Sequence, residues 1–191
     1  MKHRSIWKIP ALVVLVLLAG WTWALAQTQE FSADQILLGP GGEQQTRLYC
    51  KADRWRVDAT QQGKEMIQIF RLDRKVAWMV IPEDKIYIES PLSADAPPWG
   101  ETVPGEIERK ALGEEAVDDH PALKYQVKTS DGEFAHEILV WISKELQVPV
   151  KTTSLDGRWG STLKNIQIGP QPDDLFEVPA GFKQISPPLV R

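Results

Sequence analysis

The chain has 191 residues and a formal net charge of −4. Nucleic acids and anionic membrane surfaces bind clustered Lys and Arg, so this acidic balance argues against both as electrostatic partners. The single cysteine, Cys50, excludes a disulfide within the chain. Because it lies in a strand-like run, we expect it to be a small buried apolar residue rather than a reactive thiol.

The first 26 residues have the pattern of a secretory signal peptide. Three basic residues precede an almost wholly apolar run over residues 9–20, and Ala24-Leu25-Ala26 supplies a small-x-small cleavage site. We therefore expect cleavage before Gln27 and export to the periplasm. The mature chain, residues 27–191, would form a single domain with a net charge of −7 and no integral membrane span.

An uncleaved membrane anchor is the competing interpretation of the same segment. The apolar stretch over residues 9–26 is long enough to cross a bilayer, and Trp21 and Trp23 could lie at its interface. The short apolar core and the position of the Ala-x-Ala motif favour cleavage.

The first predicted strands form hairpins. Residues 31–38 and 46–51 flank the turn-forming cluster Gly39-Pro40-Gly41-Gly42, which indicates two antiparallel strands. Residues 54–58 then alternate strictly, with Trp55 and Val57 on one face and charged side chains on the other. One side of this strand is predicted to face water.

The next two runs, residues 66–71 and 75–81, are apolar on both faces. Ile67 and Ile69 alternate with Met66 and Phe70, and a second set of apolar residues alternates in the same way with Trp78 and Val80. In an antiparallel sheet, such strands require a second layer, a helix in the concavity, or a cavity that accepts an apolar guest.

Residues 91–105 contain four prolines and two glycines and predict a long loop. Its Trp99 either pins a surface loop to the body of the domain or belongs to a flap over a cavity. The acidic run over residues 107–117 is compatible with either a helix or a strand.

The last part of the chain predicts an antiparallel meander of three strands, over residues 134–142, 148–155 and 159–168. Asp156-Gly157 supplies a hairpin turn. Pro149 has no amide hydrogen, so it must lie at an edge or a bulge. Because no amphipathic helix is evident, we predict a mainly β fold.

Two stretches resemble exported bacterial domains of unknown function in the outer-membrane lipoprotein carrier superfamily. Residues 71–89 resemble its R-x-D … W-x-x-x-P-x-x-K-x-Y-x-E segment, and residues 174–182 resemble its L-F-x-V-P-x-G ending. The closing strands around Trp141-Ile142, 148–151 and 163–166 are also similar. The resemblance implies a curved antiparallel sheet, an incomplete β-barrel with little helix, whose concave side holds an acyl chain in the carriers.

Catalysis is not indicated. The mature chain has only His120 and His136, and the sequence contains no zinc-ligand pair, nucleophile elbow, phosphate-binding glycine loop or dinucleotide fingerprint. We therefore predict that the protein is not an enzyme and uses no metal or cofactor.

Five tryptophans remain after residue 26, and they either fill the barrel or line an apolar groove within it. We hypothesise a periplasmic binding or carrier protein that shelters a lipid or lipoprotein acyl chain. The alternative is an envelope protein-interaction or sensor module without a bound ligand. The predicted ligand-binding residues are Trp55, Ile67, Ile69, Trp78, Val80, Trp99, Ile138, Val140 and Trp141.

Overall fold

The computed structural model describes residues 29–92, 100, 102–130, 132 and 134–186. The predicted signal peptide, its cleavage site and Trp99 lie outside the described residues. Within the described part, twelve strands form one sheet and a 3₁₀ helix, η1 (Asp173–Phe176), follows β11. The strands are β1 (Phe31–Gly39), β2 (Gly42–Lys51), β3 (Arg54–Gln61), β4 (Lys64–Arg71), β5 (Val76–Ile81), β6 (Ile86–Pro91), β7 (Glu106–Val117), β8 (His120–Ser130), β9 (Ala135–Ser143), β10 (Pro149–Ser154), β11 (Gly160–Ile168) and β12 (Lys183–Ile185).

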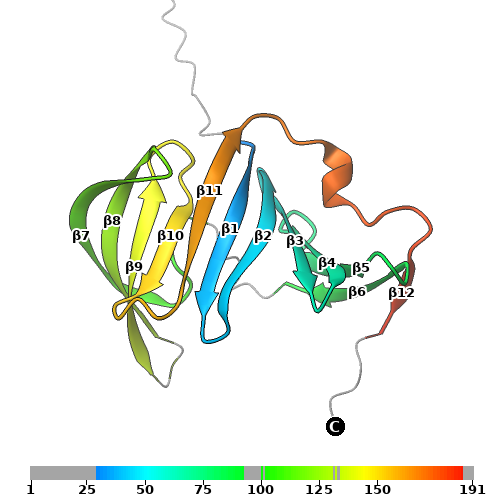
Figure 1. Cartoon of the computed structure of the whole chain (residues 1–191), viewed down its shortest axis with the longest axis horizontal. Helices are drawn as coiled ribbons and strands as arrows, with labels where there is room; N and C mark the ends of the chain where they lie inside the picture. The colour runs from blue at the N-terminus through cyan, green and yellow to red at the C-terminus, as the bar shows by residue number, and fades with distance from the viewer. Residues whose placement is uncertain (1–28, 93–99, 101, 131, 133, 187–191) are drawn as a thin grey trace, which may run out of the picture.

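The strands follow the order β12-β6-β5-β4-β3-β2-β1-β11-β10-β9-β8-β7 across the sheet. Most neighbours are consecutive hairpins, but β1 pairs with β11, and the short β12 adds to β6 in parallel. The sheet is strongly curved and is not closed into a barrel (Figure 1). The predicted mainly β, incomplete barrel with little helix is therefore confirmed.

Local signals placed most of the strands and turns correctly. The meander of β9, β10 and β11 is antiparallel, and a register shift lies between Pro149 and Lys151, so the proline occupies an irregular position as predicted. The ambiguous run over residues 107–117 is a strand, β7, on one edge of the sheet. Its ladder to β8 contains two register shifts, which interrupt a regular edge.

Cross-strand partners point to the same side of a sheet, so the register defines two faces. Phe31, Cys50, Trp55 and Phe70 are successive partners on β1 to β4, and we call this side the Trp55 face. The opposite side, which we call the Trp78 face, carries successive partners on β2 to β5: Tyr49, Arg56, Ile69 and Trp78.

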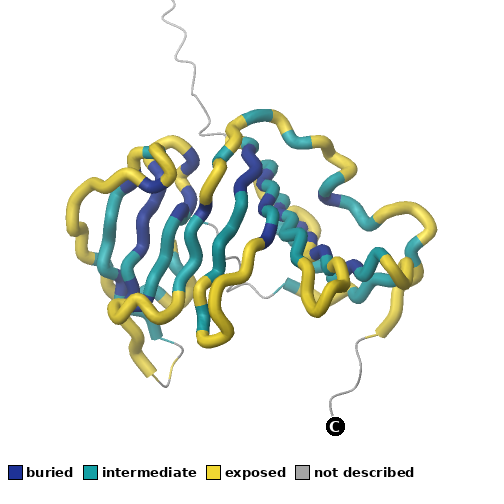
Figure 2. Tube along the Cα trace, viewed as in Figure 1, coloured by how far each residue is buried: buried dark blue, intermediate teal, exposed yellow. Residues whose placement is uncertain are grey.

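The main core lies on the Trp55 face near the centre of the sheet. Phe31, Leu48 and Cys50 are fully buried there, and Phe31 meets the Trp55 ring edge-on at a centroid distance of 6.0 Å. In Figure 2, the buried residues of β1 and β2 gather toward the end of the sheet where β1 begins. Burial raises the pKa of the Cys50 thiol to about 12, which fits the predicted inert apolar role.

Candidate functional site: the two faces of the sheet

The Trp78 face of β4 and β5 is covered by the C-terminal segment of the chain. We call residues 169–182 the C-terminal strap. Its Phe176 is fully buried and packs with four predicted ligand-binding residues, Ile67, Ile69, Trp78 and Val80. The apolar side chains that sequence reasoning gave to a ligand therefore contact the protein's own strap.

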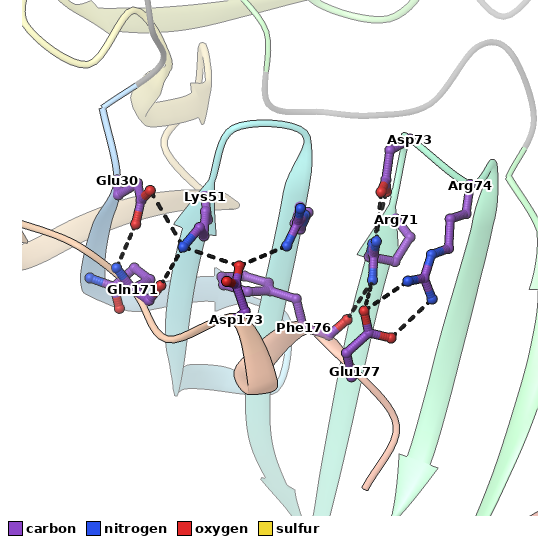
Figure 3. Close-up of polar contacts among 10 residues, drawn as sticks. Glu30, Lys51, Arg71, Asp73, Arg74, Gln171, Asp173, Phe176 and Glu177 are labelled. Carbon is purple, nitrogen blue, oxygen red and sulfur yellow. Dashed lines mark hydrogen bonds and ion pairs between the residues drawn. The ribbon is translucent and has the colours of Figure 1, made fainter.

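A buried arginine holds the middle of the strap. Arg71 is 2% exposed and donates to both carboxylate oxygens of Asp73 at 2.8 and 2.6 Å. It also donates to the Phe176 carbonyl oxygen at 3.2 Å and to Glu177, which accepts two further bonds from Arg74 (Figure 3). The hydrogen bonds from Arg71 lower the pKa of Asp73 and keep it charged.

A second set of polar contacts anchors the beginning of the strap. Asp173 lies 3.1 Å from Lys51 Nζ and 2.9 Å from Arg54 Nη1, and Lys51 also donates to the Gln171 carbonyl oxygen at 2.8 Å (Figure 3). The backbone N–H of Gln171 donates to Glu30 Oε2 at an N···O distance of 2.6 Å. The strap is thus fixed at both ends of η1 and covers the Trp78 face of β4 and β5.

The Trp55 face of β4 to β6 is different. Phe70 packs against the main core, but none of the core clusters of described residues includes any other apolar side chain of this face. The remaining apolar side chains are only half-buried. They lie on one surface, because cross-strand partners share a side of the sheet; the partners are Ala59 and Met66, Phe70 and Ala77, Met79 and Ile88, and Ile81 and Ile86. This open apolar strip consists of Met66, Ala77, Met79, Ile81, Ile86 and Ile88.

A hollow of about 340 Å³ lies on the same face at the other side of the curved sheet. Leu37 and Leu163 supply apolar lining, while Gln35 and Ser161 supply polar lining. Gln35 Nε2 donates to Ser161 Oγ at 2.9 Å, and Thr46 Oγ1 donates to Gln35 Oε1 at 3.2 Å. The hollow therefore offers apolar walls and a few fixed polar groups, an arrangement typical of small-molecule sites.

The open apolar strip and the hollow lie toward the same end of the sheet. Leu37, Ile81 and Ile86 are within a few residues of the β1–β2 and β5–β6 turns, and Ser161 follows the β10–β11 turn. The other end of the Trp55 face is filled by the main core. Among the residues that the structure describes, this face is therefore closed at one end and apolar but incompletely covered at the other.

The predicted ligand-binding residues do not share one surface. Trp55 and Trp141 belong to the main core, and Ile138 and Val140 belong to a separate cluster with Val127. Each described member of the predicted set is at most 8% exposed, so it packs within the protein. The Trp141 ring, on the other side of β9 from Val140, lies under the ammonium groups of two lysines.

The half-buried residues that sequence reasoning omitted were visible in the same pattern. Met79 and Ile81 alternate with the predicted Trp78 and Val80, so period two alone separates the two sets. Which set is covered depends on Phe176, far along the chain from β5, and no local signal reports that contact.

The fold resembles several solved structures at low sequence identity. An uncharacterized conserved protein from Thermus thermophilus has a TM-score of 0.59 and 15% identity, covering 85% of this chain and 93% of that one. MucB in the Pseudomonas aeruginosa MucA/MucB complex has a TM-score of 0.53 and 13% identity, covering 81% of this chain. The alignment covers 57% of that chain, so the present chain spans a little over half of its length.

One further match has a lower TM-score. A domain assigned to outer membrane lipoprotein sorting in Vibrio parahaemolyticus has a TM-score of 0.34 and 13% identity, covering 77% of this chain and 89% of that one. No protein-family model and no curated protein matches the chain. The comparisons thus show the fold of the chain.

Two further features of the described residues concern membranes and metals. None of their helices is long and apolar enough to span a membrane. The same residues contain no group of three or more His, Cys, Asp or Glu side chains able to hold a metal ion.

Proposed function

We propose that the protein is a periplasmic binding or carrier protein that holds an apolar ligand, a lipid or a lipoprotein acyl chain, against its Trp55 face. The observation that carries this proposal is the open apolar strip, which leaves six apolar side chains half-buried outside every described core cluster. Soluble proteins rarely leave a contiguous apolar surface without a partner.

The ligand class follows from the lining of this face. The polar groups that line the hollow are the neutral amides and hydroxyls of residues such as Gln35, Thr152 and Ser161, together with Lys151, and no acidic side chain lines it to form an acid–base pair. An acyl chain that buries about ten methylenes gains about 8 kcal/mol, which corresponds to a dissociation constant of about 1 µM before ordering costs. This environment supports binding rather than catalysis.

Binding of a fluorescent fatty acid to the delipidated mature protein tests the proposal. Met79→Gln and Ile88→Gln each place an amide in the open apolar strip, and we expect each to weaken binding about tenfold. Ile107→Gln is the matched control, because Ile107 is 61% exposed on β7, away from the strip. No uptake by folded wild-type protein, or an equal loss in the control, would refute the proposal.

A second candidate is an envelope protein-interaction or sensor module without a bound ligand. The fold likeness to MucB, which was solved in complex with MucA, favours this candidate. Photocrosslinking from the edge strand β7 in an envelope extract would then yield a discrete protein adduct, and the fatty acid would not bind.

A further inference from the structure

A group of exposed apolar side chains lies at the open end of the Trp55 face. Leu38 is the last residue but one of β1 and lies on the opposite side of that strand from Leu37, Phe134 precedes β9, and Leu155 and Trp159 are the first and last residues of the β10–β11 turn. They are 40%, 63%, 53% and 46% exposed, respectively. We call this group the Trp159 rim. Figure 1 shows the β1–β2 and β10–β11 turns at the end of the sheet where β8 ends and β9 begins.

Pairing and shape place these turns side by side. Leu38 pairs with Gly160 across the β1–β11 ladder, which brings the first and last turns together. One depression of about 690 Å³ is lined from the β1–β2 turn, the start of β9 and the β10–β11 turn, including Pro40, His136 and Leu155. Trp159 lines this depression and also the hollow on the Trp55 face, so the rim is continuous with the proposed ligand site.

The β10–β11 turn is held rigidly while its apolar side chains remain in water. Ser154 Oγ donates to Asp156 at 2.6 Å, the Arg158 amide donates to the same carboxylate at 3.1 Å, and the Ser154 amide donates to the Trp159 carbonyl oxygen at 3.0 Å. Hydrogen bonds from Ser154 and Arg158 lower the pKa of Asp156 to about 2. The turn therefore presents Leu155 and Trp159 in a fixed position.

The backbone beside Trp159 is equally constrained. A Cβ atom at Gly160 would lie 2.5 Å from the Thr152 carbonyl oxygen, so the two strands of this hairpin approach too closely for any larger residue. A side chain at Gly160 would therefore force the backbone beside Trp159 to shift.

The charges around the rim nearly cancel. Lys128 and Arg158 are balanced by Glu137 and Asp156 among the residues that line the depression. A strongly charged partner would find no complementary field here. Exposed Trp and Leu side chains on projecting turns, without net charge, suit the interface of a zwitterionic bilayer, where Trp is enriched.

We propose that the Trp159 rim inserts into the surface of a lipid bilayer, so that an acyl chain passes directly between the membrane and the Trp55 face. This inference rests on the proposed function and adds to it the source of the ligand and the route by which it enters.

Flotation of the mature protein with phosphatidylcholine vesicles tests the rim. We expect wild-type protein to float with the vesicles, and Leu155→Ser and Trp159→Ser each to reduce the partition coefficient about tenfold. Ile107→Ser, at an exposed apolar residue outside the rim, is the matched control and should stay within about twofold of wild type. Absence of wild-type flotation, or an equal loss in the control, would overturn the inference.

Leu155→Ser also separates this inference from ligand binding, because Leu155 does not line the hollow. We expect it to slow transfer of a fluorescent fatty acid from vesicles and to leave the equilibrium affinity for the free fatty acid unchanged. Uptake of free fatty acid without vesicle binding would overturn the rim alone. Vesicle binding without any uptake would support the rim as a membrane contact and overturn the ligand function.

Discussion

Replacing Phe176 by Ala tests whether the C-terminal strap is an integral part of the fold. The ring is fully buried against Ile67, Ile69 and Trp78, so the substitution removes a large side chain and leaves a cavity. Comparable Phe→Ala changes cost about 3–5 kcal/mol. For a domain of this size, that loss lowers the melting temperature by about 10 °C.

Urea unfolding of residues 27–191, followed by circular dichroism, measures this change in the free energy of unfolding. Hydrogen exchange adds a local readout, since the amides of β4 and β5 should lose protection when the strap is loosened. Asp174→Ala is the matched control, because Asp174 is exposed in the same 3₁₀ helix. A loss below about 1 kcal/mol for Phe176→Ala would refute our account of the Trp78 face.

Three further predictions concern buried charge and the thiol. Arg71→Leu leaves its carboxylate partners and the Phe176 carbonyl oxygen without their donor, so it should lower the free energy of unfolding in urea by about 3 kcal/mol. Arg74→Leu, at a half-exposed residue, should lower it by under about 1 kcal/mol. Equal losses in the two variants would contradict the role of burial. The pKa of Asp73 is lowered in the folded state. Ionised Asp73 therefore stabilises the fold above the pKa that this carboxyl has in the unfolded chain, about 4, and this contribution is lost as the pH falls through its pKa in the folded state. Asp73→Asn should therefore flatten the acid limb of a stability profile measured between about pH 2 and 6; an unchanged slope would count against this. Cys50 should resist a thiol reagent at about pH 8 until the protein is unfolded, and rapid stoichiometric labelling of native protein would show that burial does not protect it.

The strands were predictable because their signals are local. The glycine cluster at residues 39–42 and Asp156-Gly157 stand at turns, and period-two alternation separated Trp55 and Val57 from their charged neighbours. The irregular position of Pro149 followed from its missing amide hydrogen. Each of these features depends on residues that are close together in the sequence.

Only part of the candidate site could be predicted, because the signals that decide it are distant in the sequence. Two apolar faces on β4 and β5 were evident, but the choice between them depends on a contact with Phe176 that is distant in the sequence. The L-F-x-V-P-x-G resemblance marked this segment without showing that its phenylalanine is buried under the sheet. The predicted ligand-binding set therefore mixed residues from both faces.

The pairing of β1 with β11 has a consequence for how an exported chain would reach its native state. Phe31 lies opposite Ile168, so the first strand cannot complete its hydrogen bonds until nearly the whole polypeptide has been delivered. Contacts between such distant parts of a chain slow folding and prolong the lifetime of aggregation-prone intermediates. We expect refolding in vitro to be slow for a protein of this size, because β1 and β11 must meet before the sheet is complete.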